Sequence, residues 1–172
     1  MNDLHDSRNL TMLTDFYELT MANGYFKNGF KDTIAYFDMF FRTIPDGGGY
    51  VIMAGVEQLV DYFRNLSFSK EDIDYLRGKG FSEDFLDYLA NFRFACDVWT
   101  VPEGTPIFPG EPIVTVKGPI MQAQFVETMV LLCINHQSLI ATKANRIVRA
   151  AQGRPIMEFG SRRAQGFDAA IY

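Results

Sequence analysis

Residues 158–163 of this chain, which read Glu-Phe-Gly-Ser-Arg-Arg, combine side chains that could bind an anion together with an aromatic ring. The guanidinium of Arg162 can hold a carboxylate or phosphate through two parallel hydrogen bonds, and Ser161 adds a hydroxyl group. The ring of Phe159 offers a flat face for a planar ligand. If residues 155–160 form a strand, these groups follow its carboxyl end, where α/β proteins place their ligands. The competing interpretation is a surface ion pair between Glu158 and one of the two arginines.

Three residues nearer the N-terminus could contact the same kind of ligand. Asp15 and Tyr17 begin a predicted helix over residues 14–23, where Tyr17 could present a second ring or simply pack in the core. Arg42 ends a predicted hydrophobic strand and could reach a phosphate, although solvated strand ends show the same pattern. The glycines at 47–49 lack the lysine and hydroxyl of a P-loop, so we predict a flexible turn there.

The histidines and cysteines favour structural roles over catalysis or metal binding. His136 lies on a mostly apolar predicted helix, where a hydrogen-bonded core position is more common than a catalytic one. His5 falls in a polar lead-in over residues 1–10. Cys96 and Cys133 have apolar neighbours and no second cysteine or histidine at metal-ligand spacing, so we expect no metal site. Two free, buried thiols fit a reducing cytoplasm.

The elements that must position these residues mix helices and strands, which predicts an α/β fold. Hydrophobic residues at helical spacing predict helices over 14–23 and 55–65. In the first of these, Asp15 and Glu18 resemble a capping box, and Gly24 is well placed to end the helix. Two further short helices are expected after Ser69 and Ser82, which are favourable N-cap residues.

Strands are predicted from β-branched and aromatic runs between turn residues. Residues 33–42 are apolar on both faces, which is typical of a covered strand. Short strands follow over 97–101 and 113–116.

A helical pattern then extends from about 119 to 151, either as one long helix or as two helices that break at the polar residues 135–138. We therefore divide the chain into an N-terminal α/β domain, 1–118, and a second portion, 119–172.

Composition and charge limit the possible functions. The 172 residues are 48% hydrophobic, which excludes a disordered chain. Residues 1–117 carry a formal charge of −8 and residues 118–172 carry +3, a distribution that argues against general nucleic-acid binding and allows a local anion site. The longest strongly apolar stretch, 129–134, is far shorter than the roughly 20 residues that span a bilayer, and the N-terminus does not resemble a signal peptide. We expect a cytoplasmic protein without membrane contact.

Five ordered segments that extend over nearly the whole chain together resemble the nicotinate phosphoribosyltransferase family. They cover residues 13–22, 37–42, 103–112, 135–144 and 158–166. The resemblance implies conversion of nicotinate and phosphoribosyl pyrophosphate to nicotinate mononucleotide and pyrophosphate, coupled to ATP hydrolysis, in NAD salvage. It also implies an α/β N-terminal domain followed by an irregular β/α barrel, in a homodimer whose sites lie at the subunit interface.

The resemblance also implies roles for individual residues. Phe159 would stack on the pyridine ring, with Tyr17 of the partner subunit on its other face. Ser161 and Arg162 would lie near the nicotinate carboxylate and the phosphoribosyl phosphates. Asp15 and Arg42 would line the site from the partner side. These roles agree with the chemistry of the side chains, because a sandwiched ring, a carboxylate and a pyrophosphate require aromatic faces and arginines.

The family's chains are much longer than this one, and this difference limits what the chain alone can do. The phosphorylated histidine and the acidic residues around the ribose and Mg²⁺ would lie beyond residue 172, and neither His5 nor His136 matches that histidine. Residues 119–172 would contain a long helix and only the start of the barrel. We therefore expect no catalytic residue in this portion, no bound ATP or Mg²⁺, and no turnover by the chain alone.

Three alternatives remain open at this point. The chain could be a non-catalytic fragment that associates with a full-length subunit. It could belong to a related nicotinamide or quinolinate phosphoribosyltransferase. The short strands between 101 and 117 also suggest a lipoyl or biotinyl carrier module, but that module needs a lysine at a hairpin tip, and the nearest lysine is Lys117.

Overall fold

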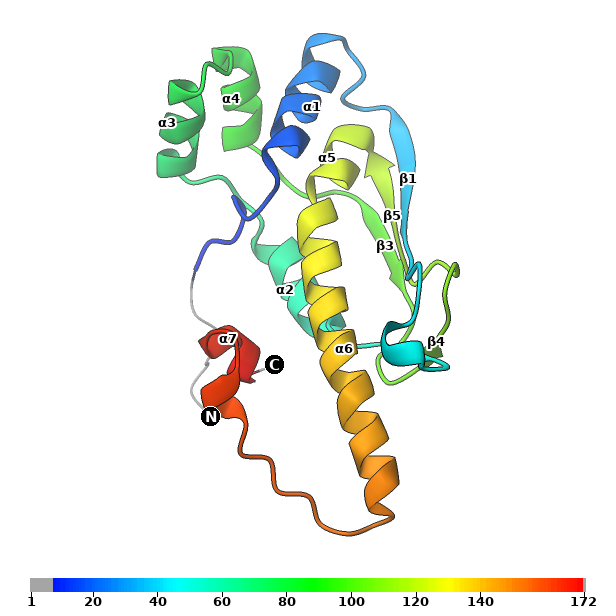
Figure 1. The fold of residues 1–172 in the computed structure, drawn as a ribbon. Helices are drawn as coiled ribbons and strands as arrows, with labels where there is room; N and C mark the ends of the chain where they lie inside the picture. Colours follow the sequence, from blue (N-terminus) through cyan, green and yellow to red (C-terminus); the bar gives the residue numbers. More distant parts are fainter. Residues whose placement is uncertain (1–7, 172) are drawn as a thin grey trace.

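The computed structural model describes residues 8–171 and combines helices with two small antiparallel sheets (Figure 1). Its first half contains α1 (Phe16–Lys27), β1 (Ile34–Met39), η1 (Pro45–Gly47), β2 (Val51–Ile52), α2 (Val56–Asn65), α3 (Lys70–Gly78) and α4 (Glu83–Ala90). Its second half contains β3 (Asp97–Thr100), β4 (Pro106–Ile107), β5 (Val114–Pro119), α5 (Ile120–Phe125), α6 (Glu127–Ala151), η2 (Ser161–Arg163) and α7 (Phe167–Ile171). The predicted α/β class is confirmed, while the predicted boundary at residue 118 stays a prediction.

The main sheet has the strand order β1-β5-β3, with β5 at its centre. Val116 pairs with Phe37 on one side and with Val98 on the other, and its side chain is buried. Helix α5 packs against β5 and β1, and α1 packs against α5. The predicted covering of β1 on both faces is wrong: Ile34 and Tyr36 are 56% and 63% exposed, because β1 is an edge strand and their face of it is open to solvent.

Helix α1 differs from its prediction at both ends. It continues through Gly24 to Lys27, because a glycine costs a helix interior only about 1 kcal/mol and packing against α5 outweighs that cost. Asp15 holds the N-cap position, but its side chain makes no capping hydrogen bond, and Glu18 points into the protein instead. The predicted capping box is therefore wrong for α1.

The N-cap prediction at Ser69 is confirmed for α3. There the Ser69 hydroxyl accepts from the Asp72 backbone N–H, and the Asp72 carboxylate accepts from the Ser69 N–H. Ser82 is the N-cap of α4, although its side chain makes no capping hydrogen bond.

Helix α6 runs without interruption over 25 residues, so of the two predicted alternatives the break at residues 135–138 is wrong and a single helix passes through them. The discontinuity lies earlier, at Val126, between α5 and α6. The polar residues of α6 have a tertiary role: the Ser138 hydroxyl bonds to both backbone groups of Ala54, and the Thr142 hydroxyl accepts from the Ile52 N–H at 2.8 Å. These hydrogen bonds attach strand β2 to the side of the helix.

Aromatic side chains form the part of the core between the helical layer and the sheet. Phe92 and Phe125 lie 5.9 Å apart between ring centroids, and Phe68 contacts both rings. Phe85 is fully buried and contacts Phe26 of α1. The high phenylalanine content of the sequence is thus explained by packing.

After α6, the chain turns at Gly153 and continues in an extended segment to η2 and α7 (Figure 1). The strand predicted over 155–160 does not form, because a strand needs a hydrogen-bonded neighbour and the described part of the chain pairs none with this segment. Helix α7 lies beside the start of the described chain, where the Arg8 guanidinium donates to the Asp168 carboxylate at 2.8 Å.

Candidate functional site

The first turn of α1 presents two of the predicted site residues on its outer face. Asp15 is exposed, and Tyr17 is 42% exposed. Partial burial raises the pKa of the Tyr17 phenol, and a side-chain hydrogen bond with Glu127 and the negative charges nearby add to that increase. Tyr17 is therefore a neutral hydroxyl and an accessible ring at physiological pH, rather than the core residue that the alternative interpretation predicted.

Behind this turn lies a buried carboxylate, Glu18, whose role sequence reasoning missed. Its side chain accepts hydrogen bonds from Thr14 and from the backbone N–H and hydroxyl of Thr128. Burial raises its pKa to about 7, although the Thr128 hydrogen bonds act in the opposite direction. The sequence offered no clear signal for this, because the apolar residues Phe16, Tyr17 and Met21 are exposed and Glu18 lies on the opposite, buried face with Leu19 and Ala22.

Residues 158–163 present the second group of predicted site residues. Phe159 is 69% exposed, and Ser161 and Arg162 are exposed in η2. The Glu158 carboxylate accepts from the Gly160 N–H at 2.5 Å. Within residues 8–171 it forms no ion pair with Arg162 or Arg163, so the surface ion-pair interpretation is wrong and both guanidiniums remain available for an anion.

The structure does not bring these two groups together within one chain. The start of α1 lies beside α4 and α5, whereas η2 and α7 lie at the opposite end of the molecule (Figure 1). Arg42 is exposed just after β1, at a third position on the surface. Across the described residues, the six predicted site residues thus form three separate exposed positions.

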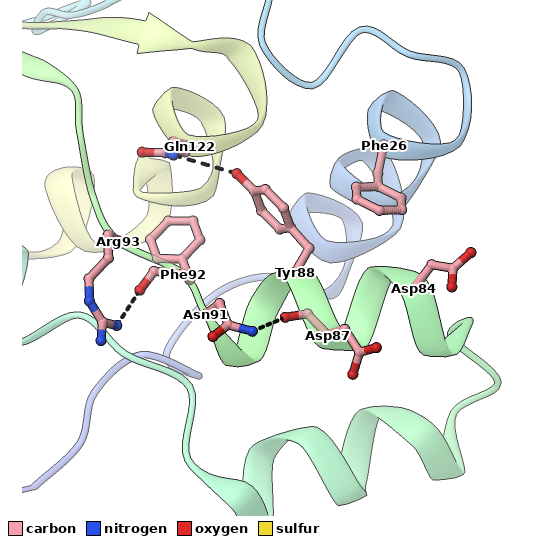
Figure 2. A pocket seen from close by; sticks show the side chains of 8 residues that line it. All are labelled: Phe26, Asp84, Asp87, Tyr88, Asn91, Phe92, Arg93 and Gln122. Atoms are coloured by element: carbon pink, nitrogen blue, oxygen red, sulfur yellow. Dashed lines mark hydrogen bonds between the residues drawn. The ribbon is translucent and has the colours of Figure 1, made fainter.

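The described residues enclose two cavities of note, and neither is lined by any of the six residues. Figure 2 shows the smaller one, of about 530 Å³, with the Tyr88 ring pointing toward Gln122. It is lined by Phe26, Asp84, Asp87, Tyr88, Asn91, Phe92, Arg93 and Gln122. Its polar groups are largely engaged with one another and with the backbone, as in the Asn91 to Asp87 hydrogen bond of 2.8 Å.

The larger cavity, of about 1090 Å³, lies between α2, α6, the start of the described chain and α7. Three of its buried polar atoms have no hydrogen-bond partner among the described residues: the Tyr62 hydroxyl, Gln58 Oε1 and His136 Nε2. His136 is thus half-buried at a cavity wall, rather than a hydrogen-bonded core residue. His5 lies outside the described residues.

The geometry of the remaining candidate groups is as follows. Residues 8–171 contain no group of three histidine, cysteine, aspartate or glutamate side chains that could hold a metal ion. Cys96 and Cys133 are free and half-buried. Lys117 lies inside the central strand β5, with its ammonium 5.3 Å from the Tyr36 ring centroid, so it cannot serve as the hairpin-tip lysine of a carrier module. None of the described helices is long and apolar enough to cross a bilayer.

Comparison with known proteins identifies a family model and several relatives that this chain resembles. Residues 12–135 match the family model described as the nicotinate phosphoribosyltransferase (NAPRTase) N-terminal domain. The chain is 49% identical over 160 residues to nicotinate phosphoribosyltransferase pncB2 of Mycobacterium tuberculosis, which covers 92% of this chain and 34% of the relative. It is 39% identical over 164 residues to the Bacillus subtilis nicotinate phosphoribosyltransferase, covering 95% of this chain and 34% of the relative.

A solved structure agrees with this placement. The crystal structure of human nicotinic acid phosphoribosyltransferase superposes with a TM-score of 0.82 at 35% identity, covering 92% of this chain and 33% of the human chain. The chain therefore spans about a third of the length of the relatives that it matches. On this evidence, the chain belongs to the nicotinate phosphoribosyltransferase family, and its residues 12–135 correspond to the N-terminal domain of that family.

Proposed function

We propose that this chain supplies the N-terminal third of an enzyme that transfers a phosphoribosyl group to nicotinate in NAD salvage. The observation that carries the proposal is the 49% identity over 160 residues to a relative named nicotinate phosphoribosyltransferase. That match covers 92% of this chain, and the residues that the resemblance assigns to substrate are distributed along it from Asp15 to Arg162. A nicotinamide or quinolinate enzyme is the weaker candidate, because both named relatives act on nicotinate.

The exposed groups of the chain suit the two substrates. A pyridine ring can stack on the open face of Phe159, a contact worth about 0.5–1.5 kcal/mol beyond the apolar area that it buries. The neighbouring Arg162 and Ser161 can hold the nicotinate carboxylate or the phosphates of phosphoribosyl pyrophosphate. Both substrates are anionic, which agrees with the formal charge of +3 on residues 118–172.

The separation of Tyr17 from Phe159 within the chain supports a site built from two subunits. In a homodimer, Tyr17, Asp15 and Arg42 of one subunit would face Phe159 of the other. A two-fold arrangement of this kind makes two equivalent sites from the same pair of surfaces.

The surface of the chain also supports completion by the remaining two-thirds that its relatives possess. Large apolar side chains stay exposed along α6 and the segment after it. They are Leu131, Leu132, Leu139, Ile140, Ile147, Val148, Ile156, Met157 and Phe159. Exposed apolar surface of this extent marks a contact region, and the unpaired Tyr62 hydroxyl and His136 Nε2 lie beside it in the larger cavity.

Because residues 8–171 contain no group of three histidine, cysteine, aspartate or glutamate side chains that could hold a metal ion, we assign no Mg²⁺ site to them. Coupling to ATP and a requirement for Mg²⁺ stay predictions about an enzyme of the relatives' full length. We also propose a cytoplasmic location, because the two free cysteines agree with a reducing compartment.

The proposal is tested by replacing the N-terminal third of the Mycobacterium tuberculosis relative with residues 1–172 of this chain. We expect this chimera to form nicotinate mononucleotide from nicotinate and phosphoribosyl pyrophosphate. The variants Phe159→Ala and Arg162→Ala should lower kcat/KM about tenfold to a hundredfold, whereas Arg154→Ala, outside the matched motif, is the control. A folded chimera that forms no product, or one that prefers nicotinamide, would contradict the proposal.

Experiments on the 172-residue chain by itself test the alternative that it is a non-catalytic fragment. We expect that chain to form no nicotinate mononucleotide, and turnover by it would overturn this expectation. Size-exclusion chromatography tests association: a chain that stays monomeric at high concentration, alone and with a full-length relative, argues against a fragment that acts by docking.

A further inference from the structure

Glu18 is the only buried carboxylate among the described residues, with 1% of its surface exposed. It follows the exposed Tyr17 on α1 and shares the buried face of that helix with Leu19 and Ala22, and its hydrogen bonds reach Thr128, 110 residues away. Its Oε1 atom accepts from the Thr128 hydroxyl at 2.7 Å and from the Thr128 backbone N–H at 3.1 Å. Its Oε2 atom is paired with the Thr14 hydroxyl. Both carboxyl oxygens are therefore occupied by partners.

The Thr128 hydroxyl continues this connection to a predicted site residue. While it donates to Glu18, it accepts from the Asp15 backbone N–H at 3.3 Å. The Asp15 carbonyl in turn accepts from the Glu18 N–H at 3.0 Å, so Asp15, Glu18 and Thr128 form a closed ring of hydrogen bonds. The first turn of α1 is thus fixed at both of its ends to the first turn of α6.

We propose that Glu18 is a positioning residue, which acts through Thr128 to hold the turn that presents Asp15 and Tyr17 to the substrate. The inward carboxylate and the outward pair belong to the same helical turn, so the direction of the pair follows from the anchoring of the carboxylate. The catalytic consequence of this role rests on the proposed function. The anchoring itself can be measured without any substrate.

The surroundings of Glu18 make its charge depend on pH near neutrality, whereas the hydrogen bonds of the anchor are kept in both protonation states. The charged groups that act on Glu18 are Asp15, at the N-cap of α1, and Glu127 of α6, and both are acidic. The phenols of Tyr17 and Tyr62 also lie within the influence of the Glu18 charge, which helps to keep them neutral. Burial first, with the negative charges of Glu127 and Asp15 adding to it, raises the pKa of Glu18 to about 7. The protonated form can donate to Thr14 while still accepting from Thr128, so it keeps every hydrogen bond of the network.

The anchoring is tested on the 172-residue chain by NMR. In the wild type, the Tyr17 ring and Thr128 methyl signals should titrate with a midpoint near pH 7, and Glu18→Gln should remove that inflection. Glu18→Gln can still accept from Thr128, so amide exchange in the first turn of α1 should stay within about threefold of the wild type. Glu18→Ala leaves the Thr128 N–H and hydroxyl unpaired, and exchange there should accelerate about tenfold or more.

Two controls sharpen this test. Glu57→Gln removes an exposed carboxylate from the first turn of α2 and should change neither the titration nor the exchange. Thr128→Val preserves shape and removes the bridging hydroxyl, so it should accelerate exchange at Asp15. Unchanged exchange in Glu18→Ala would overturn the assignment of Glu18 as an anchor. Persistence of the inflection in Glu18→Gln would show that another group titrates, which would contradict the assignment of the inflection to Glu18.

The catalytic consequence is measured separately in the chimera described above. Glu18→Ala should raise the KM for nicotinate with a smaller effect on kcat, and Glu18→Gln should restore the KM at pH 7. An unchanged KM in Glu18→Ala would contradict the positioning role. If the chimera with the wild-type residues makes no product, the proposed function fails, while the NMR result still decides whether Glu18 anchors the turn.

Discussion

Glu103 caps the N-terminus of helix α2 across 48 residues of sequence: its Oε1 atom accepts from the backbone N–H groups of Gly55 and Val56, each at 2.7 Å. A helix start carries unpaired N–H groups and a partial positive charge, so a carboxylate is a favourable acceptor there. Gly55 itself holds the N-cap position and has no side chain to offer. The turn that contains Glu103 therefore supplies the cap that the local sequence lacks.

Removal of this distant cap should weaken the fold. We expect Glu103→Ala to lower the free energy of unfolding by about 1–2 kcal/mol, as loss of a capping side chain does elsewhere. Glu103→Gln should lose less, because its amide oxygen still accepts. Denaturant unfolding checks this, with the exposed Glu111→Ala in the following turn as the matched control. Equal stabilities of the Glu103→Ala and Glu111→Ala variants would contradict the capping role.

Two glycines should respond to alanine in opposite directions. Gly55 has φ +107° and lies against α6, where an added Cβ would come 2.8 Å from the Cys133 carbonyl oxygen. Gly55→Ala should therefore destabilise the protein by roughly 2 kcal/mol or more. Gly24 lies inside α1 with no atom within 4 Å of the Cβ position, so Gly24→Ala should stabilise by about 0.5–1 kcal/mol. Thermal unfolding measures both, and shifts of the same sign would disprove this explanation.

The stability of the chain should fall as pH rises from about 5 to about 7. The pKa of Glu18 is near its ordinary 4.5 in the unfolded chain and about 7 in the folded one, so the folded state binds more protons between these values. The contribution is fully present below pH 4.5, is lost through pH 7, and amounts to about 3 kcal/mol at most. Unfolding measured from pH 5 to 8 should show a smaller slope in Glu18→Gln. Identical slopes would indicate that another group is responsible.

The two cysteines should react slowly with alkylating agents. Burial raises the pKa of the Cys133 thiol to about 11 and that of Cys96 to about 12, and the Asp97 charge adds to the effect at Cys96. Since only the thiolate is nucleophilic, we expect iodoacetamide at pH 7.5 to label the folded chain at least about tenfold more slowly than the urea-unfolded chain. Mass spectrometry counts the labels, and equal rates in the two states would contradict burial of the thiols.

Features set by neighbouring side chains could be predicted from the sequence, and features set by distant partners could not. Ser69 and Asp72 are three residues apart and cap α3 as expected, because both halves of the capping box are local. Glu18 and Asp15 have the same spacing, but Glu18 bonds instead to Thr128, 110 residues away. The spacing of Asp15 and Glu18 alone cannot show whether the Glu18 carboxylate will bond to the start of its own helix or to a distant residue such as Thr128.

The difference between local and distant partners also explains where the structure departs from the other expectations. The polar residues 135–138 suggested a break in the long helix, yet Ser138 is buried because it bonds to Ala54, a contact that only the folded chain creates. Residues 155–160 have a strand-like sequence and no neighbouring strand in the described part of the chain. The candidate site was predicted by residue type and by resemblance, and its separation within one chain follows from the length of α6, which no motif encodes.

The measurement that tests the central claim most directly is the rate of nicotinate mononucleotide formation by the chimera of residues 1–172 with the remainder of the Mycobacterium tuberculosis relative. We predict a rate that depends on both nicotinate and phosphoribosyl pyrophosphate, and that falls about tenfold or more in Tyr17→Ala and in Phe159→Ala. A folded chimera whose product formation does not depend on nicotinate, or is unchanged in both variants, would contradict the account.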